Sequence, residues 1–109
     1  MKAIGLFLIC MFYSMQSFAQ AVVIDVRTPT EYAEKHIPGA INIDHSLIAT
    51  EIQKLKIAKD DKIILYCRSG RRSGIALEAL KKLGFQNLEN YGGLEEAQNR
   101  LSTQDANKK

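Results

Sequence analysis

KIILYCRSGRRSGIALEALKKLG, residues 62–84, places a strand, a short loop and a helix in direct succession. KIILY (62–66) has the length and apolar character of a strand buried within a parallel sheet. Apolar residues then recur at helical spacing over 73–83, and Gly84 suits the position just after a helix end. Cys67 directly follows the strand. It therefore lies at the carboxyl end of a sheet strand, where open α/β sheets bind ligands.

Strand and helix patterns alternate along the rest of the chain. The β-branched run at 21–26 predicts a buried strand, and weaker strands are expected at 40–43 and 85–91. Three further helices are expected, namely Pro29 to near His36 with Thr28 and Glu31 as a capping box, Ser46–Lys56 with Ser46 as cap, and Leu94–Leu101. The alternation predicts an α/β fold whose mainly parallel central sheet of four to five short strands is flanked by helices.

The size and composition of the chain fit one globular domain. It has 109 residues, of which 46% are hydrophobic and 25% charged, and no repeat is visible. We assign residues 20–101 to this domain and expect the unpatterned segment 102–109 to be a disordered tail. A net charge of +3 is too small to indicate nucleic-acid binding.

Residues 1–19 have the pattern of a secretory signal peptide. Lys2 is followed by an apolar run to Tyr13, and Ser17 and Ala19 provide the small residues of a cleavage site before Gln20. Eleven apolar residues fall short of the ~20 that a membrane anchor needs. Cys10 lacks the preceding small residue of a lipoprotein cleavage site. We therefore expect export, to a periplasm in a diderm bacterium, with no stable membrane anchor after cleavage.

Cleavage would leave Cys67 as the single cysteine of the mature protein. In an exported chain an unpaired cysteine is buried, pairs with another chain, or reacts by design. The loop after Cys67 favours reactivity: Gly70 permits a tight turn, and Ser69 and Ser73 can donate hydrogen bonds. A helix N-terminus also brings backbone amides and positive dipole toward the sulfur, which favours a thiolate. The alternative is a small buried core residue, a common environment for free cysteine.

Arg68, Arg71 and Arg72 cluster where the helix dipole disfavours cations. Violations of local rules are expected mainly at functional sites. The cluster therefore predicts an anionic substrate. We expect Arg72 or Arg71 to bind it and Arg68 to lie at the rim.

Four segments of the chain resemble the rhodanese family in order and spacing. They are Ile24-Asp25-Val26-Arg27 with Glu31-Tyr32, His36 to Ile43, Tyr66-Cys67 with its loop, and Asn90 to Leu94. The resemblance covers residues 21 to about 101 and is closest to the short exported form of the family. One departure is that little precedes Ala21, so an edge of the sheet is expected to be abbreviated.

This resemblance implies that Cys67 takes sulfur from an anionic donor such as thiosulfate, holds it as a persulfide, and passes it to a thiol or other thiophilic acceptor. Substrate binding then falls to the loop residues Arg68, Ser69, Gly70, Arg71, Arg72 and Ser73. Chemistry of this kind requires no metal and no organic cofactor. Asp25 and Arg27 match a family motif beside the site. Loop orientation is their functional interpretation, and a structural ion pair is the one we favour.

Two other functions remain open from the residues. Related phosphatase and arsenate-reductase loops place arginine six positions after cysteine, where this chain has Ser73. A non-catalytic sulfur-binding or sensing module would retain the fold without turnover, although Cys67 and its loop are intact. His36 is expected in a structural role and His45 matches no motif. A zinc site built from these histidines and Cys67 lacks the usual paired ligand spacing.

Overall fold

The structure is a computed structural model that describes residues 21–107, in which four strands form one parallel sheet. The strands are β1 (Val22–Asp25), β2 (Ile41–Asn42), β3 (Lys62–Tyr66) and β4 (Asn87–Asn90), in the order β2-β1-β3-β4. The predicted α/β fold with a parallel sheet is confirmed. The predicted signal peptide lies outside the described residues.

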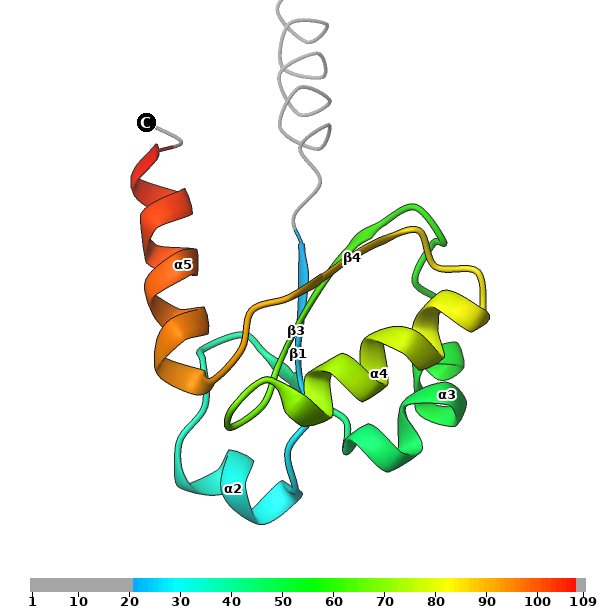
Figure 1. Ribbon diagram of the computed structural model, residues 1–109, viewed down its shortest axis with the longest axis horizontal. Coiled ribbons are helices and arrows are strands. Elements are labelled where there is room, and N and C mark those ends of the chain that lie inside the picture. The colour runs from blue at the N-terminus through cyan, green and yellow to red at the C-terminus, as the bar shows by residue number, and fades with distance from the viewer. Residues whose placement is uncertain (1–20, 108–109) are drawn as a thin grey trace, which may run out of the picture.

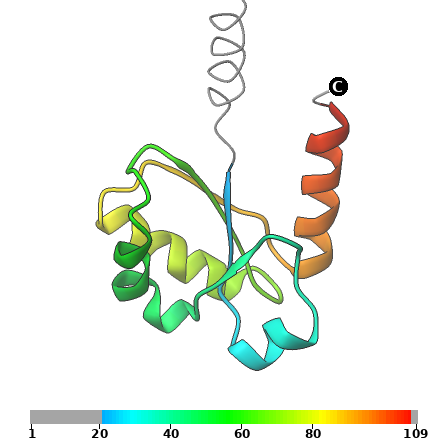
Figure 2. The same cartoon turned by 180° about the vertical axis from the view of Figure 1, so that it is seen from behind.

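Helices cover both faces of this sheet (Figures 1 and 2). Helices α3 (Ile48–Glu51) and α4 (Arg71–Lys82) pack on one face, and α2 (Pro29–Glu34) and α5 (Leu94–Asn107) contribute to the other. Along β3, Ile63 and Leu65 enter the first core, while Ile64 and Tyr66 enter the second. Alternate side chains of one strand thus serve two apolar layers, which explains its uninterrupted apolar sequence. Across residues 21–107, no helix is both long and apolar enough to cross a bilayer.

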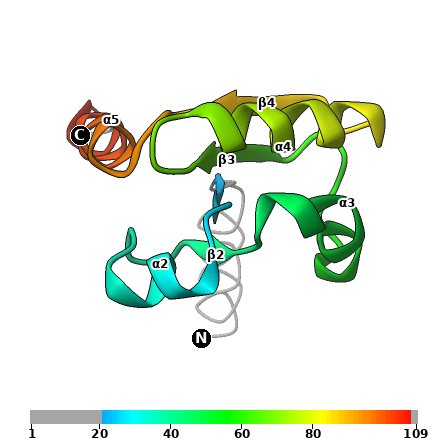
Figure 3. The same ribbon diagram turned by 60° about the horizontal axis from the view of Figure 1, so that its bottom comes forward.

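Hydrogen bonds just beyond the strand ends connect the carboxyl ends of β1, β3 and β4. The Val26 amide donates to the Tyr66 carbonyl, and the Tyr91 amide donates to the Leu65 carbonyl. One residue further on, the Cys67 amide donates to the Gly92 carbonyl. Figure 3 brings this end of the molecule forward, with the β3–α4 loop beside the chain that leaves β4. Cys67 therefore lies at a fixed point where loops from different strands meet.

The prediction of one continuous α-helix over 46–56 is wrong. The segment forms a 3-10 turn η1 (His45–Leu47), the single α-turn α3, and a second 3-10 segment η2 (Ile52–Leu55). Only two residues of the apolar stripe, Ile48 and Ile52, are buried, while Leu47 and Leu55 are 53% and 39% exposed. Burial therefore holds one face in helical register but does not enforce α geometry at either end. The N-cap of η1 is Asp44 and not Ser46, because the Asp44 carboxylate accepts a hydrogen bond from the Ser46 amide.

The last helix extends further than expected. We predicted an end at Leu101 and a disordered tail from 102, whereas α5 continues to Asn107. The segment contains neither glycine nor proline, and the Thr103 hydroxyl donates to the Asn99 carbonyl within the helix. Nothing in the sequence breaks the helical backbone, so loss of the apolar stripe alone did not mark its end. The other elements begin and end within two residues of their predicted bounds.

Candidate active site

The Cys67 sulfur lies inside a cradle made by its own loop. The Gly70 amide donates to Sγ at 2.9 Å, and the Ser73 hydroxyl oxygen lies 3.5 Å from it. Backbone amides of Ser69 and Ser73 also interact favourably with the sulfur. Gly70 adopts a left-handed φ of +98°, which lets the chain curl around the sulfur. The tight turn expected at Gly70 is present, and its role in substrate binding stays a prediction.

Helix α4 begins immediately after this cradle, two residues earlier than predicted. Gly70 occupies its N-cap position and provides no side-chain cap. The first amides of the helix are therefore available to an outside acceptor. The Cys67 sulfur fills that role, as an anion does at a helix N-terminus.

Hydrogen bonding makes Cys67 more acidic despite its burial. Cys67 is 1% exposed, and burial by itself raises the pKa of its thiol. The Ser73 hydroxyl and the Ser73, Ser69 and Gly70 amides outweigh that effect, so the pKa is lowered from its ordinary value. A cysteine buried only against apolar groups would shift the other way. This environment favours a reactive thiolate over the core-residue interpretation.

The Gly92-Gly93 turn forms a second wall of the cradle. A β-carbon on Gly93 would lie 2.5 Å from the Arg68 carbonyl oxygen, and one on Gly70 would lie 3.3 Å from the Gly92 Cα. The two loops therefore touch through their backbones. Glycines are required here because the approach leaves no room for a side chain.

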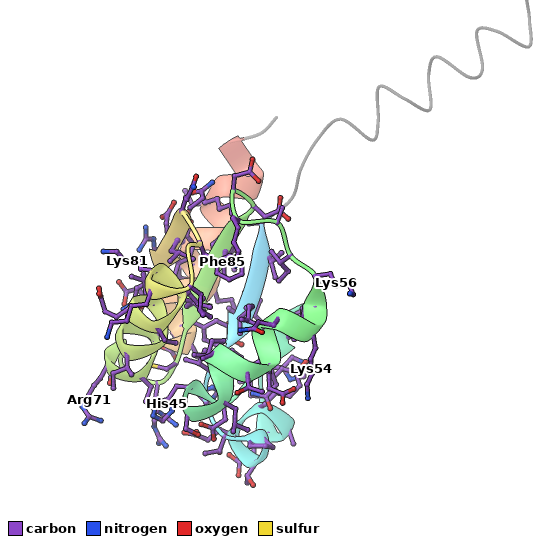
Figure 4. The ribbon with its side chains drawn as sticks, turned by 90° about the vertical axis from the view of Figure 1, so that its right-hand side faces the viewer. His45, Lys54, Lys56, Arg71, Lys81 and Phe85 are labelled. Atoms are coloured by element: carbon purple, nitrogen blue, oxygen red, sulfur yellow. The ribbon has the colours of Figure 1, made fainter. Side chains whose placement is uncertain are left out.

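The three arginines near the cysteine have different partners. Arg72 donates from Nη1 and Nη2 to the two carboxylate oxygens of Glu31, at 2.9 and 3.1 Å. Arg68 is 79% exposed and reaches the same carboxylate at only 3.6 Å. Arg71 has no hydrogen bond or ion pair within residues 21–107, and Figure 4 shows its side chain extending away from the ribbon. Arg68 and Arg71 are thus the cations of this cluster with weak or no protein partners.

Comparison with known proteins agrees with this geometry. The family described as "Rhodanese-like domain" matches residues 11–100. The thiosulfate sulfurtransferase PspE of Escherichia coli is 38% identical over 92 residues, covering 84% of this chain and 88% of that protein. This chain belongs to the rhodanese family.

Other rhodaneses support the assignment. The thiosulfate:glutathione sulfurtransferase of Saccharomyces cerevisiae is 36% identical over 66% of this chain, which spans 60% of that enzyme. A solved structure described as a rhodanese with anions from E. coli is 39% identical, with a TM-score of 0.67 over 71% of this chain and 91% of that one. The match to a single sulfurtransferase domain is therefore seen in both sequence and fold.

Glu31 contacts the cysteine-bearing loop and helix, although sequence reasoning gave it a role only in a helix cap and placed it in a family segment. The capping box is present: Glu31 bonds to the Thr28 amide and hydroxyl, and the Thr28 hydroxyl accepts from the Glu31 amide. The same carboxylate crosses to Arg72 of α4. Hydrogen bonding from Arg72 and then from Thr28 lowers its pKa to about 2. Its position in the family motif was the only signal of this second role.

Asn90 is the other residue not assigned to the site from the sequence. It ends β4 and bonds through its amide group to Gly70, Ser73 and Gly92. It thus joins both walls of the cradle. Its place in a family motif marked the segment but gave no reason to select this side chain.

Asp25 and Arg27 form the structural ion pair that we favoured. Both are buried, and Arg27 donates from Nη2 to Asp25 Oδ2 at 2.6 Å and from Nε to Oδ1 at 2.9 Å. The same Nη2 donates to the Lys35 carbonyl at 2.6 Å, which ties the end of α2 to β1. Hydrogen bonding to Asp25 raises the pKa of Arg27. The pair stabilises the chain after β1, and no bond joins it to the Cys67 loop among the described contacts.

The two histidines make local contacts. His36 Nδ1 lies 2.7 Å from the Tyr32 carbonyl oxygen, and its ring stacks on Tyr32 with centroids 3.6 Å apart. His45 Nδ1 lies 3.2 Å from Asp44 Oδ1 without hydrogen-bond geometry. Among the described residues, no three side chains of the metal-binding types form a cluster.

A cavity of about 640 Å³ lies away from Cys67. Its lining includes Ala21 just before β1, Val22 at the start of β1, Ile41 of β2, and Gln98 and Leu101 of α5. The residues of the cysteine loop do not contribute to it. This cavity and the cradle around Cys67 are therefore separate features of the structure.

Proposed function

We propose that this protein is a thiosulfate sulfurtransferase that carries sulfane sulfur as a persulfide on Cys67. The main observation behind this proposal is that the Cys67 sulfur lies at the N-terminus of α4, where amide and hydroxyl donors lower the pKa of its thiol. A thiolate is the form that attacks sulfur. The names and likeness of its relatives support thiosulfate as the donor.

In the first half-reaction the Cys67 thiolate attacks the outer sulfur of thiosulfate. A bond forms between Sγ and that sulfur, the sulfur–sulfur bond of thiosulfate breaks, and its electron pair leaves with sulfite. The resulting persulfide anion extends from the sulfur that the loop amides already contact. Amide donors in a buried loop stabilise such an anion without reorganisation.

In the second half-reaction a thiophilic acceptor, such as a thiolate, attacks the terminal persulfide sulfur. The bond between that sulfur and Sγ breaks, and the electron pair returns to Cys67 as a thiolate. The cycle is redox-neutral and needs no cofactor. A glutathione-using relative supports a low-molecular-weight thiol as one class of acceptor.

Donor binding falls to the loop residues Arg68, Ser69, Gly70, Arg71, Arg72 and Ser73. Arg72 was our first candidate together with Arg71, but both ends of its guanidinium already bind Glu31. We therefore assign capture of the anion to Arg68 and Arg71, and a supporting electrostatic role to Arg72. Backbone amides of Ser69, Gly70 and Ser73 would hold the transferred sulfur.

Export completes the proposal. We infer that residues 1–19 are a signal peptide, that cleavage precedes Gln20, and that the mature domain acts in the periplasm. The residue pattern of the segment and the similarity to PspE support this proposal. Amino-terminal sequencing of protein recovered from a periplasmic fraction tests it, and a mature chain that retains Met1 would contradict it.

Intact-mass measurement tests the persulfide directly. After incubation with thiosulfate and removal of excess reagent, we expect the protein to gain the mass of one sulfur and to release one sulfite. Cys67→Ser should gain nothing, and a thiol acceptor should return the wild-type mass to its starting value. An unchanged wild-type mass would overturn the mechanism.

Two further assays separate the alternatives. A sensing module would take up one sulfur but show no multiple turnover with excess thiosulfate and thiol. A phosphatase-like enzyme would hydrolyse p-nitrophenyl phosphate without sulfur transfer. We expect turnover in the first assay and no hydrolysis in the second.

A further inference from the structure

The Ser73 hydroxyl has more acceptors than protons. Its oxygen lies 2.6 Å from Asn90 Oδ1, 3.1 Å from the Gly70 carbonyl oxygen and 3.5 Å from Cys67 Sγ. A serine hydroxyl carries one proton and donates strongly to one partner at a time. The distances place that proton toward Asn90. The sulfur therefore shares the hydroxyl only weakly in this state.

Two other hydrogen bonds fix the orientation of the Asn90 amide. Nδ2 donates to the Gly70 carbonyl at 2.9 Å, and Oδ1 accepts from the Gly92 amide at 2.9 Å. Because nitrogen faces a carbonyl and oxygen faces an amide, the reversed assignment would oppose like groups. Oδ1 is therefore the atom that faces Ser73. The hydroxyl must donate to it, since a carboxamide oxygen cannot donate.

Asn90 is not left without a donor when it gives up this bond. Its Oδ1 retains the Gly92 amide as a donor when the hydroxyl turns away. Asn90 also lies at the surface, where water can take the vacated position. A charged sulfur, in contrast, attracts a hydroxyl proton more strongly than a neutral carboxamide does. The balance between the two acceptors depends on the charge of the sulfur.

We propose that Asn90 is a positioning residue that holds the Ser73 hydroxyl while Cys67 is neutral and releases it to the sulfur when the sulfur becomes anionic. Only the hydroxyl torsion changes. The proton stays on Oγ and no covalent bond forms or breaks. This inference rests on the proposed function for its use in catalysis, because both the attacking thiolate and the departing thiolate of the second step would receive the released donor.

The test is a double-mutant cycle read by the alkylation rate of Cys67. Iodoacetamide reacts with the thiolate, so the rate below the thiol pKa reports the thiolate fraction. Peptide mass spectrometry assigns the product to Cys67. The cycle comprises the wild-type protein, Asn90→Ala, Ser73→Ala and the double variant, with Asn87→Ala as control because Asn87 is exposed at the other end of β4.

Removal of Oδ1 leaves the Gly70 carbonyl, at 3.1 Å, to compete with the sulfur for the hydroxyl proton, and an anionic sulfur is the stronger acceptor. Asn90→Ala should therefore alkylate about three- to tenfold faster than wild type at a pH below the thiol pKa. The same change in the Ser73→Ala background should have an effect of less than about twofold. An equal effect in both backgrounds would show that Asn90 only buttresses Gly70, and it would overturn the proposal. Asn87→Ala should match wild type.

Two provisions keep the result decisive. Thermal unfolding of each variant confirms that it is folded, and Asn90→Leu, which is close to asparagine in shape and cannot accept, repeats the cycle if Asn90→Ala unfolds. Alkylation also requires no sulfur donor. A chain that shows the coupling but takes up no sulfur would contradict the proposed function alone, whereas sulfur uptake without coupling would contradict only the role of Asn90.

Discussion

Arg72 of α4 donates two hydrogen bonds, of 2.9 and 3.1 Å, to the carboxylate of Glu31, which lies 41 positions earlier in α2. The pair joins the first turn of α2 to the first turn of α4, which directly follows the cysteine loop. It also leaves the oxygens of Glu31 in competition with any anion that approaches Arg72. The Glu31 carboxylate thus neutralises part of the positive charge of the arginine cluster.

Glu31→Gln should lower stability at neutral pH and lose its effect in acid. The pKa of about 2 in the folded protein lies below the ordinary carboxyl value near 4.5. The stabilisation is therefore complete above about pH 4.5 and disappears as the pH falls toward 2. We expect a difference of about 1 kcal/mol at pH 7, since the pair is partly exposed. Denaturant unfolding from pH 7 to 2.5 measures it.

Glu34→Gln is the matched control for that series, because Glu34 is exposed on the same helix. It should leave the free energy of unfolding at pH 7 unchanged. A Glu31→Gln deficit that persists undiminished at pH 2.5 would contradict the assignment to the carboxylate charge.

Arg68→Ala and Arg71→Ala should each weaken the binding of thiosulfate without affecting the fold. Both side chains are exposed and have weak or no partners, so their charge is free to attract an anion. We expect the KM for thiosulfate to rise about threefold or more in each variant, with kcat nearly constant and the effect reduced by salt. Steady-state kinetics at two ionic strengths measure this. Lys81→Ala, at the far end of α4, should behave as wild type, and an equal rise in KM there would point to general surface charge.

Gly93→Ala should disrupt the site through its backbone. The new methyl group would lie 2.5 Å from the Arg68 carbonyl oxygen, so one of the two loops must move. We expect a loss of about 1–3 kcal/mol in stability and a larger proportional loss of sulfur transfer. Thermal unfolding and initial rates measure the two effects.

Gly74→Ala provides the contrast for that substitution. Its methyl group would meet Asn90 Nδ2 at an ordinary 3.5 Å, within α4. Alanine favours a helix, so stability should be unchanged or higher by up to about 1 kcal/mol. Equal losses in the two alanine variants would refute the steric explanation for Gly93.

Asp25→Asn should destabilise the fold far more than it alters the chemistry. It leaves the buried Arg27 guanidinium without its counter-charge, which typically costs about 3–5 kcal/mol. The protein that remains folded should take up sulfur normally, because Asp25 does not contact the cysteine loop. Urea unfolding and sulfur uptake per folded molecule test both statements. Glu51→Gln, which breaks the exposed pair with Lys54, should cost less than about 0.5 kcal/mol.

The sequence predicted the elements that burial enforces. β3 was located to the residue because its apolar run serves both cores, and Thr28 and Glu31 identified the start of α2. The segment at 46–56 was predicted less well, since only Ile48 and Ile52 of its apolar stripe are buried and nothing holds its ends in α geometry. The end of α5 was missed because a helix can continue without an apolar stripe.

The site was predicted in the same uneven way. Cys67 and Gly70 follow from local chemistry, as the strand, the turn and the helix start are adjacent in sequence. Glu31 and Asn90 reach the loop across 41 and 20 residues. Their contacts depend on the order of strands in the sheet, which a single sequence does not encode locally. Longer-range partners of a loop are therefore visible only after the fold is known.

The bond from the Cys67 amide to the Gly92 carbonyl ties the nucleophile to a segment that becomes its neighbour only when β4 docks beside β3. Unless the two strands pair, the cysteine lacks the Gly92-Gly93 wall of its cradle. The full set of contacts around Cys67 therefore requires the paired sheet. Opening of this sheet edge would remove the Gly92-Gly93 wall, so the complete cradle around Cys67 exists only in the native fold.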